Sequence, residues 1–296
     1  MIQWKYKNSA KVLTTREKGG VPYLSFDVLE KTGLVINGFS TRLGGVSKGD
    51  CASMNFSYTR GDDPKDVLEN FTRMATALGV DRDRMTVSWQ THTVNVRRMT
   101  KADEGKGVII PRDYRDVDGM ITDVPGQTLV TFYADCVPLY FVDRTHRAIG
   151  LSHSGWRGTV KAMGQETIKA MKEAFGTRPE DLVVCIGPSI CKDCFEVGEE
   201  VVEEFKEAFA PRWHSSLFTE GKAPGKYQLD LWTANEILFL EAGLKKEQIH
   251  TANICTMCNH EVLFSHRKAG AKRGTLAAFL CLNLSGARQS NGTVRD

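Results

Sequence analysis

Apolar residues recur every three or four positions in four stretches of the chain, which is the pattern of helices that bury one face. The clearest stretch follows Asp63-Pro64, a capping residue and a proline suited to the first helical turn. Val67 and Phe71 begin its apolar face, and Gly79 is a natural stop. The same spacing predicts further helices over 160–175, 197–209 and 231–238.

Short apolar runs rich in β-branched and aromatic residues alternate with these helices and predict buried strands. Some runs follow one another at hairpin-like distances, and others flank predicted helices. A mixed sheet, or two packed sheets with outer helices, fits this order better than a strictly parallel fold. We therefore expect the α+β class, with mixed β-sheets flanked by helices. The strands are predicted over 128–133, 139–142, 148–152, 182–186, 249–254 and 275–280.

The 296 residues contain no repeat and no linker rich in proline or serine, so we expect one domain over 1–284 and a polar C-terminal tail over 285–296. A net charge of +3 is too small to predict nucleic-acid or anionic-membrane partners. The first residues lack the apolar stretch of a signal peptide, and no apolar run reaches the roughly 20 residues of a membrane span. We expect a cytoplasmic protein whose eight cysteines are thiols.

One cysteine and two histidines, Cys136, His92 and His153, stand where strand patterns break into loops. Zn²⁺ binds such ligands tetrahedrally, and three protein ligands leave one position for a water whose pKa the metal lowers to about 7. Asp135 is a candidate to orient a histidine or to carry a proton. Spacing alone leaves a second interpretation open, in which the cysteine is a small buried apolar residue and the histidines are ordinary loop residues.

Two glycine-flanked arginines are candidates for binding an anion. Arg157 follows His153 at the expected start of a helix, where negative charge is favoured. Arg42 lies in the segment 38–47, whose composition suits a loop that closes on a polar ligand. Each segment also has a structural interpretation, the first as a strand-to-helix turn and the second as a surface hairpin, which is the simpler explanation of 38–47. By association with these loops, the candidates for hydrogen bonds to a substrate are Ser40, Asn55 and Gln90.

Two Cys-x-x-Cys pairs, Cys191 with Cys194 and Cys255 with Cys258, resemble the halves of a zinc ribbon. About sixty residues separate the pairs, compared with the 15–20 residues usual for such sites. Each pair also adjoins a predicted core strand. We therefore expect separate thiols at these positions, rather than a structural zinc site or a redox dithiol.

Six motifs, taken in order, give the chain a resemblance to a known family. They are Gly38-Phe-Ser-Thr-Arg-x-Gly-Gly-Val-Ser47, Gln90-x-His92, Ala134-Asp-Cys-x-Pro-Leu139, His153-x-Gly-Trp-Arg-Gly158, Ile186-Gly-Pro-Ser-Ile190 and Ile254-Cys-Thr256. Over about residues 34 to 280 the chain resembles the bacterial laccase-domain family, formerly named multicopper polyphenol oxidases. That family is now understood as zinc-dependent purine nucleoside phosphorylases with adenosine deaminase activity. The departures from its usual pattern are Thr93, Ser154, Phe195 and the order Arg273-Gly274.

The resemblance implies an α/β sandwich of mixed sheets related to cysteine-hydrolase toxins, with zinc bound by His92, Cys136 and His153. It implies that adenosine, inosine, guanosine or methylthioadenosine reacts with inorganic phosphate. We expect a monomer or weak oligomer. Copper fits less well than zinc, because the seven histidines include no His-x-His pair of the kind that builds a multicopper cluster.

The leading hypothesis is phosphorolysis of purine nucleosides together with deamination of adenosine. Two alternatives stay open. Activation of Cys136 by His153 would make a metal-independent cysteine hydrolase. A zinc site that supplies folding energy would make a non-enzymatic binding module. In the leading hypothesis the catalytic residues are Cys136, His153, His92 and Asp135, and the substrate contacts are Arg42, Ser40, Asn55, Gln90 and Arg157.

Overall fold

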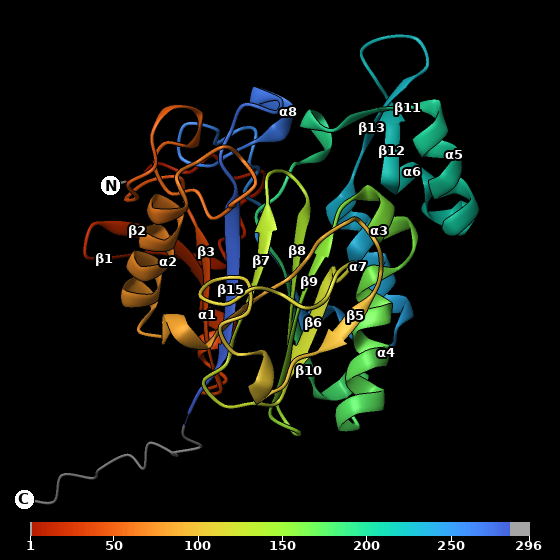
Figure 1. Cartoon of the computed structure of the whole chain (residues 1–296). Helices are drawn as coiled ribbons and strands as arrows, with labels where there is room; N and C mark the ends of the chain where they lie inside the picture. The colour runs from red at the N-terminus through yellow and green to blue at the C-terminus, as the bar shows by residue number, and fades with distance from the viewer. Residues whose placement is uncertain (1, 285–296) are drawn as a thin grey trace, which may run out of the picture.

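Two six-stranded β-sheets pack face to face at the centre of the computed structural model, which describes residues 2–284 (Figure 1). Sheet I has the strand order β1-β2-β3-β15-β7-β4 and sheet II the order β14-β10-β8-β9-β6-β5. The strands of sheet I are β1 Leu13–Lys18, β2 Val21–Phe26, β3 Val35–Ser40, β15 Leu276–Leu282, β7 Thr128–Tyr133 and β4 Met85–Val87. Those of sheet II are β14 Ile249–Thr251, β10 Leu182–Ile186, β8 Val137–Asp143, β9 Ala148–Ser154, β6 Gly119–Thr122 and β5 Val96–Arg98.

Both sheets are mixed, as the sequence predicts. Most neighbouring strands run antiparallel, but β4 pairs with β7 in parallel in sheet I. In sheet II the parallel pairs are β5 with β6 and β10 with β14. A small sheet III, in the order β11-β13-β12, lies to one side with α5 (Glu199–Ala208) and α6 (His214–Leu217) (Figure 1). Its strands are β11 Glu196–Gly198, β13 Lys226–Leu229 and β12 Phe218–Glu220.

Helices cover the outer faces of the two large sheets, so the described residues form a helix–sheet–sheet–helix sandwich (Figure 1). Helix α2 packs on sheet I, and α4 and α7 pack on sheet II. Because both faces are buried, alternate residues of β8 enter different cores: Phe141 faces the helices, whereas Tyr140 faces sheet I. The helices are α1 Asp27–Glu30, α2 Pro64–Leu78, α3 Trp156–Val160, α4 Met163–Phe175, α5 Glu199–Ala208, α6 His214–Leu217, α7 Leu231–Glu241 and α8 His266–Ala269.

The capping signals of the sequence place α2 correctly. The Asp63 side chain accepts a hydrogen bond from the Lys65 backbone at 2.8 Å, and the helix ends at Gly79, whose φ of 77° suits glycine. The helix predicted over 160–175 is divided, because Ala162 adopts a φ of 58° between α3 and α4. The predicted tail over 285–296 lies outside the described residues. Among residues 2–284 no helix is long and apolar enough to cross a membrane.

Candidate metal centre and cavity

The three predicted metal ligands come together where the two large sheets are joined. Cys136 lies in the turn that leads from β7 of sheet I to β8 of sheet II. His153 is on β9, where its backbone pairs with Pro138, and His92 lies in the loop between β4 and β5. One ligand atom from each side chain lies within 4.8 Å of the others. Sequence segments far apart thus bring together one sulfur and two nitrogen atoms that could bind a metal.

The backbone around this centre contains two strained residues, and such strain is often found at functional sites. His92 has a φ of 65° and Asp135 a φ of 91°, values that side chains other than glycine seldom adopt. Gly155 also leaves necessary space, because a Cβ atom there would lie 3.0 Å from the Cys136 sulfur and 3.2 Å from Cδ2 of His92. The close approach of the ligands therefore depends on a glycine at 155.

Asp118 organises both histidines, although it carries no recognisable motif in the sequence. Its fully buried carboxylate accepts hydrogen bonds from Nδ1 of His153 at 2.8 Å and from the His92 backbone at 3.1 Å. The other carboxylate oxygen accepts from the Thr91 and Thr93 backbones at 3.0 and 2.9 Å. Since Nδ1 of His153 is engaged, Nε2 is the nitrogen left for a metal, which is the usual role of a carboxylate behind a histidine ligand.

Electrostatics favour the anionic form of the cysteine. Burial by itself raises the pKa of the Cys136 thiol, but the imidazoles of His153 and His92 outweigh it and lower the pKa to about 6. For His153 burial acts in the opposite direction and lowers the pKa, but the negative charges of Cys136 and Asp118 outweigh burial and raise the pKa of His153 overall. The thiolate is the form that binds metal, and a metal would replace the proton between the sulfur and the imidazole. These donors fit Zn²⁺ with an open fourth position.

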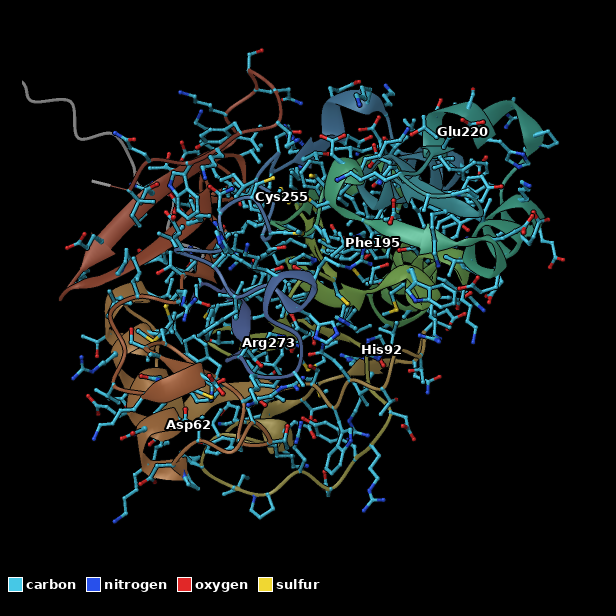
Figure 2. All side chains as sticks on the ribbon, turned by 90° about the horizontal axis from the view of Figure 1, so that it is seen from above. Asp62, His92, Phe195, Glu220, Cys255 and Arg273 are labelled. Atoms are coloured by element: carbon cyan, nitrogen blue, oxygen red, sulfur yellow. The ribbon has the colours of Figure 1, made fainter. Side chains whose placement is uncertain are left out.

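A cavity of about 330 Å³ opens over this centre, a volume suited to a small ligand. Aromatic side chains form part of its wall, including Tyr58, Trp89 and Tyr133. Figure 2 shows two of its lining residues, His92 and Arg273, near the middle of the molecule. The full lining is Ser57, Tyr58, Thr59, Arg60, Val87, Ser88, Trp89, Gln90, His92, Gly107, Arg112, Phe132, Tyr133, Ala134, Cys136, His153, Arg273 and Thr275.

Three arginines that sequence reasoning did not select line this cavity. Arg273 is only 8% exposed, and its Nε has no hydrogen-bond partner within residues 2–284. Burial and then the nearby Arg60 lower the pKa of Arg273 to about 10. Arg112 stacks on Trp89, with 4.4 Å between the guanidinium carbon and the ring centroid. A buried, incompletely paired guanidinium beside a second positive charge is an environment that favours an anion.

The predicted substrate-binding residues have different positions, and of these only Gln90 lines the cavity. The Gln90 amide is paired with the Phe132 backbone, at 2.6 Å and 2.8 Å. Ser40 accepts a hydrogen bond from the Ala277 backbone at 2.9 Å. Asn55 accepts one from the Thr275 backbone at 2.9 Å. Both are fully buried and hold the start of β15 together with Thr275, the cavity-lining residue that precedes this strand.

The two predicted anion-binding arginines lie outside this cavity. Arg42 donates to the Ala52 carbonyl at 2.9 and 3.1 Å and lies 4.6 Å from the centroid of the Phe264 ring. Arg157 is exposed and stacks on the neighbouring Trp156 at 4.2 Å. Flanking glycines in the sequence therefore did not identify the arginines that line the cavity.

Asp135 does not line the cavity that Cys136 lines. Its carboxylate accepts 2.6 Å hydrogen bonds from the Thr256 hydroxyl and from the Arg267 backbone. The Asp135 carbonyl accepts from the Ile190 backbone at 3.0 Å. These contacts hold the turn before the cysteine ligand against two other loops of the chain.

The expectation of separate thiols at the two Cys-x-x-Cys pairs is wrong. Cys191, Cys194, Cys255 and Cys258 form a four-cysteine cluster with all sulfur atoms within 4.8 Å of one another. The sixty-residue gap is spanned by the fold, because Ser189 bridges in parallel to Cys255 and thereby aligns the two loops. The cluster is a candidate metal site.

Comparison with known proteins gives a family match over most of the chain. Residues 36–283 match the family model described as multi-copper polyphenol oxidoreductase laccase. The chain is 35% identical over 249 residues to purine nucleoside phosphorylase YlmD of Geobacillus stearothermophilus, covering 83% of this chain and 89% of that protein. It is 33% identical over 246 residues to adenosine deaminase RL5 of an unknown prokaryotic organism, covering 81% and 91%.

A solved structure extends the likeness to three dimensions. The crystal structure of YlmD from Geobacillus stearothermophilus matches with a TM-score of 0.84 and 33% identity, covering 93% of this chain and 100% of that one. These comparisons do not support the predicted relation to cysteine-hydrolase toxins. On the extent of the sequence and structural match, the chain belongs to the multi-copper polyphenol oxidoreductase laccase family, among whose members are purine nucleoside phosphorylases and an adenosine deaminase.

Proposed function

We propose that this protein is a zinc-dependent purine nucleoside phosphorylase that also deaminates adenosine. The observation that carries the proposal is the placement of the buried Arg273 guanidinium in the same cavity as the ligand atoms of His92, Cys136 and His153. A metal centre beside an anion-binding group suits a reaction in which phosphate meets a neutral substrate. The activities named for the YlmD and RL5 relatives support the same choice.

In phosphorolysis an oxygen of inorganic phosphate forms a bond to C1′ of the ribose while the bond from C1′ to the purine nitrogen breaks. The bonding electrons leave with the purine, so the sugar becomes positively charged in the transition state. Arg273 and Arg60 would hold the phosphate dianion next to that charge, which lowers the barrier electrostatically. Aromatic rings such as those of Trp89 and Tyr58 would stack against the base.

Zinc bound by His92, Cys136 and His153 would supply Lewis-acid polarisation of a substrate oxygen or activation of water for the deamination. Asp118 keeps the two histidines oriented and holds the proton on Nδ1 of His153. Asp135 acts as a positioning residue in this proposal, because its carboxylate anchors the turn that carries Cys136.

A metal-independent cysteine hydrolase is the second candidate, because one observation favours it. Asp118, His153 and Cys136 form a chain of contacts like that of a thiol–imidazole–carboxylate triad. The presence of His92 at the same sulfur argues for metal, since a triad needs only one imidazole. Rapid alkylation of Cys136 in the protein as purified, with no zinc lost on alkylation, would favour the hydrolase.

The test is to incubate the full chain with adenosine, with and without inorganic phosphate, and to separate the products. Phosphate-dependent release of adenine supports phosphorolysis, and inosine supports deamination. Neither product from adenosine, and no base from inosine, guanosine or methylthioadenosine, would refute the proposal. Cys136→Ser, which removes one ligand of this centre alone, should abolish activity while the fold is retained; unfolding of this variant would instead indicate a zinc-stabilised binding module.

The anion site is tested with three matched arginine variants. We expect Arg273→Gln to raise the KM for phosphate about 10- to 100-fold, the effect of losing one charge-assisted hydrogen-bonding group. Arg42→Gln and Arg157→Gln remove the same charge at the two sites predicted from sequence. A phosphate KM that rises in these variants and stays constant in Arg273→Gln would reverse the assignment.

A further inference from the structure

The four-cysteine cluster lies apart from the proposed active site, on two loops that follow neighbouring strands. Cys191 and Cys194 flank a short turn after β10, and Cys255 and Cys258 flank another after β14. Cys191 and Cys255 are buried at 2% and 0% exposure, whereas the other two are half-buried. The two pairs therefore face each other across the loops, with one side reachable from solvent.

The sulfur separations match a single tetrahedral ion. With Zn–S bonds of about 2.3 Å, tetrahedral geometry places the sulfur atoms about 3.8 Å apart. The sulfur atoms of Cys194 and Cys258 lie 3.6 Å apart, and the other separations lie within 4.8 Å. A disulfide requires about 2.05 Å between sulfur atoms. The arrangement thus fits four thiolates around one ion better than a pair of disulfides.

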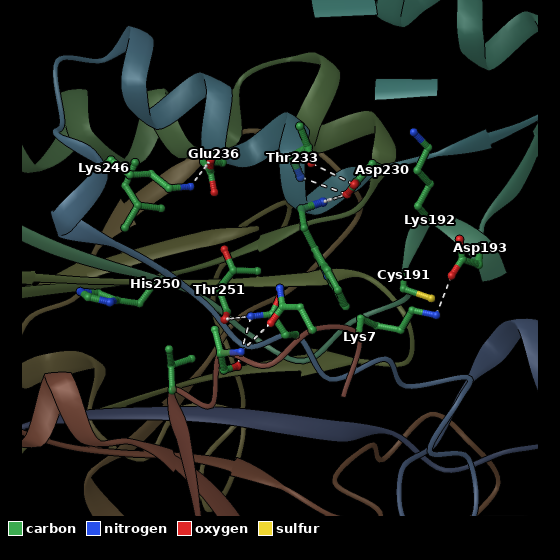
Figure 3. A pocket seen from close by; sticks show the side chains of 16 residues that line it. Lys7, Cys191, Lys192, Asp193, Asp230, Thr233, Glu236, Lys246, His250 and Thr251 are labelled. Atoms are coloured by element: carbon green, nitrogen blue, oxygen red, sulfur yellow. Dashed lines mark hydrogen bonds and ion pairs between the residues drawn. The ribbon is translucent and has the colours of Figure 1, made fainter. Parts of the chain in front are cut away.

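The surroundings also suit thiolate ligands. The Cys255 sulfur accepts backbone hydrogen bonds from Cys191 at 3.3 Å and from Cys258 at 3.4 Å, which stabilise negative charge on sulfur. The ammonium group of Lys7 lies beside Cys191 and is held there by Asp193 at 2.6 Å (Figure 3). That positive charge would offset part of the excess negative charge that four thiolates bring to a divalent ion.

The cluster is connected to the turn of the proposed active site through adjacent residues. Thr256, next to Cys255, donates to the Asp135 carboxylate at 2.6 Å. Arg267 donates to the same carboxylate through its backbone, and its guanidinium donates to the Cys194 carbonyl at 3.4 Å. Fixing the two loops would therefore also fix both partners of Asp135, which precedes Cys136.

We propose that the four-cysteine cluster binds one Zn²⁺ in a closed tetrahedral site that fastens the two loops and, through Thr256 and Arg267, supports the turn carrying Cys136. Four protein ligands leave no position for water or substrate, so this ion has a structural role. The chain would then bind two zinc ions of different kinds. The inference does not depend on the proposed enzymatic activity, since its readout is metal content.

The test is elemental analysis of the full chain and its variants, purified under reducing conditions. We expect two zinc ions per chain in the wild type, one in Cys136→Ser and one in the double variant Cys194→Ser/Cys258→Ser. Cys51→Ser, which changes a buried thiol outside both sites, is the matched control and should retain two. Cobalt substituted into Cys136→Ser should give the absorption of a tetrathiolate complex, and the double variant should not.

Alkylation and zinc content of the wild-type chain test the proposal even where the double variant fails to fold. The four cluster cysteines should resist alkylation by N-ethylmaleimide until a chelator removes zinc, and peptide mapping would show this directly. A Cys194–Cys258 disulfide in the reduced preparation, iron in place of zinc, or no more than one zinc per chain with all of it lost in Cys136→Ser would each overturn the proposal.

Discussion

Replacing Asp118 with asparagine tests how much of the metal centre depends on one carboxylate. The side chain keeps its size, but one oxygen becomes an NH₂ group. One oxygen now accepts from the His92 backbone and Nδ1 of His153, and the other accepts from Thr91 and Thr93. Whichever way the amide turns, at least two donors lose their acceptor; the cost is about 1–3 kcal/mol for the buried Nδ1 of His153 and less for the partly exposed backbone donors.

The orientation that keeps the threonine contacts has a direct effect on the metal. Its NH₂ group would donate to Nδ1 of His153, which forces the ring proton onto Nε2, the nitrogen left for zinc. The loss of a carboxylate behind a histidine ligand typically weakens metal binding 10- to 100-fold. We therefore expect Asp118→Asn to raise the zinc Kd at the His92–Cys136–His153 site by that factor, or about 1.4–2.8 kcal/mol.

The assay is competition for zinc against a chromophoric chelator, in the Cys194→Ser/Cys258→Ser background so that one site is measured. Asp116→Asn is the control, because Asp116 lies in the same loop and accepts from the Thr91 hydroxyl at 2.8 Å but contacts neither histidine. Asparagine also tolerates the φ of 55° at that position. Zinc affinities that are equal in the two variants, or within twofold of the parent, would refute the reasoning.

Three other predictions concern packing, capping and pH. Gly155→Ala should weaken zinc binding, because the added Cβ would lie 3.0 Å from the Cys136 sulfur. Gly158→Ala is the control and should leave zinc binding unchanged, because no atom lies nearer than 3.5 Å to its added Cβ. Equal effects of the two variants in the chelator assay would contradict this prediction. Asp63→Ala should lower the free energy of unfolding by about 1 kcal/mol in urea titrations, and an unchanged midpoint would show that the cap is dispensable. Burial raises the pKa of Asp103, but its hydrogen bonds outweigh this and lower the pKa from 3.8 to about 2, so about 2 kcal/mol of stability present above pH 4 should be lost as the pH falls towards 2. Asp103→Asn should lack that part of the pH dependence, and parallel profiles would contradict the assignment.

Local signals predicted the elements that are determined locally. The capped start at Asp63 and the glycine stop at 79 define α2 in both the sequence and the structure. The strands over 128–133 and 182–186 also match β7 and β10. Val197 was predicted to be helical because of its spacing, but it pairs with Tyr227 in sheet III, and that partner is thirty residues away. Tertiary pairing there outweighs the helical period.

The three candidate ligands, which the structure brings together, could be selected from the sequence because cysteine and histidine carry their chemistry in their residue type, and because the motifs around them resemble a family. Asp118, Arg60 and Arg112 could not, since aspartates and arginines are common and nothing local distinguishes those that reach the cavity. The four-cysteine cluster was rejected on sequence distance. Parallel pairing of β10 with β14 brings the two Cys-x-x-Cys loops together in space. A rule based on the number of residues between the pairs cannot predict this contact.

The turn through Cys136 is one of the connections between the two large sheets, which meet mainly through apolar side chains and through hydrogen bonds that Tyr133 and Tyr140 donate across the interface at 3.0 Å. One metal ligand is therefore attached to the connection between the layers, while His153 extends from a strand of sheet II alone. A small slide of one layer over the other would separate sulfur from nitrogen before it disturbed the hydrogen bonds within either layer. Zinc affinity should therefore depend on how the two sheets are aligned. Core substitutions far from the cavity should weaken zinc binding before they unfold the protein.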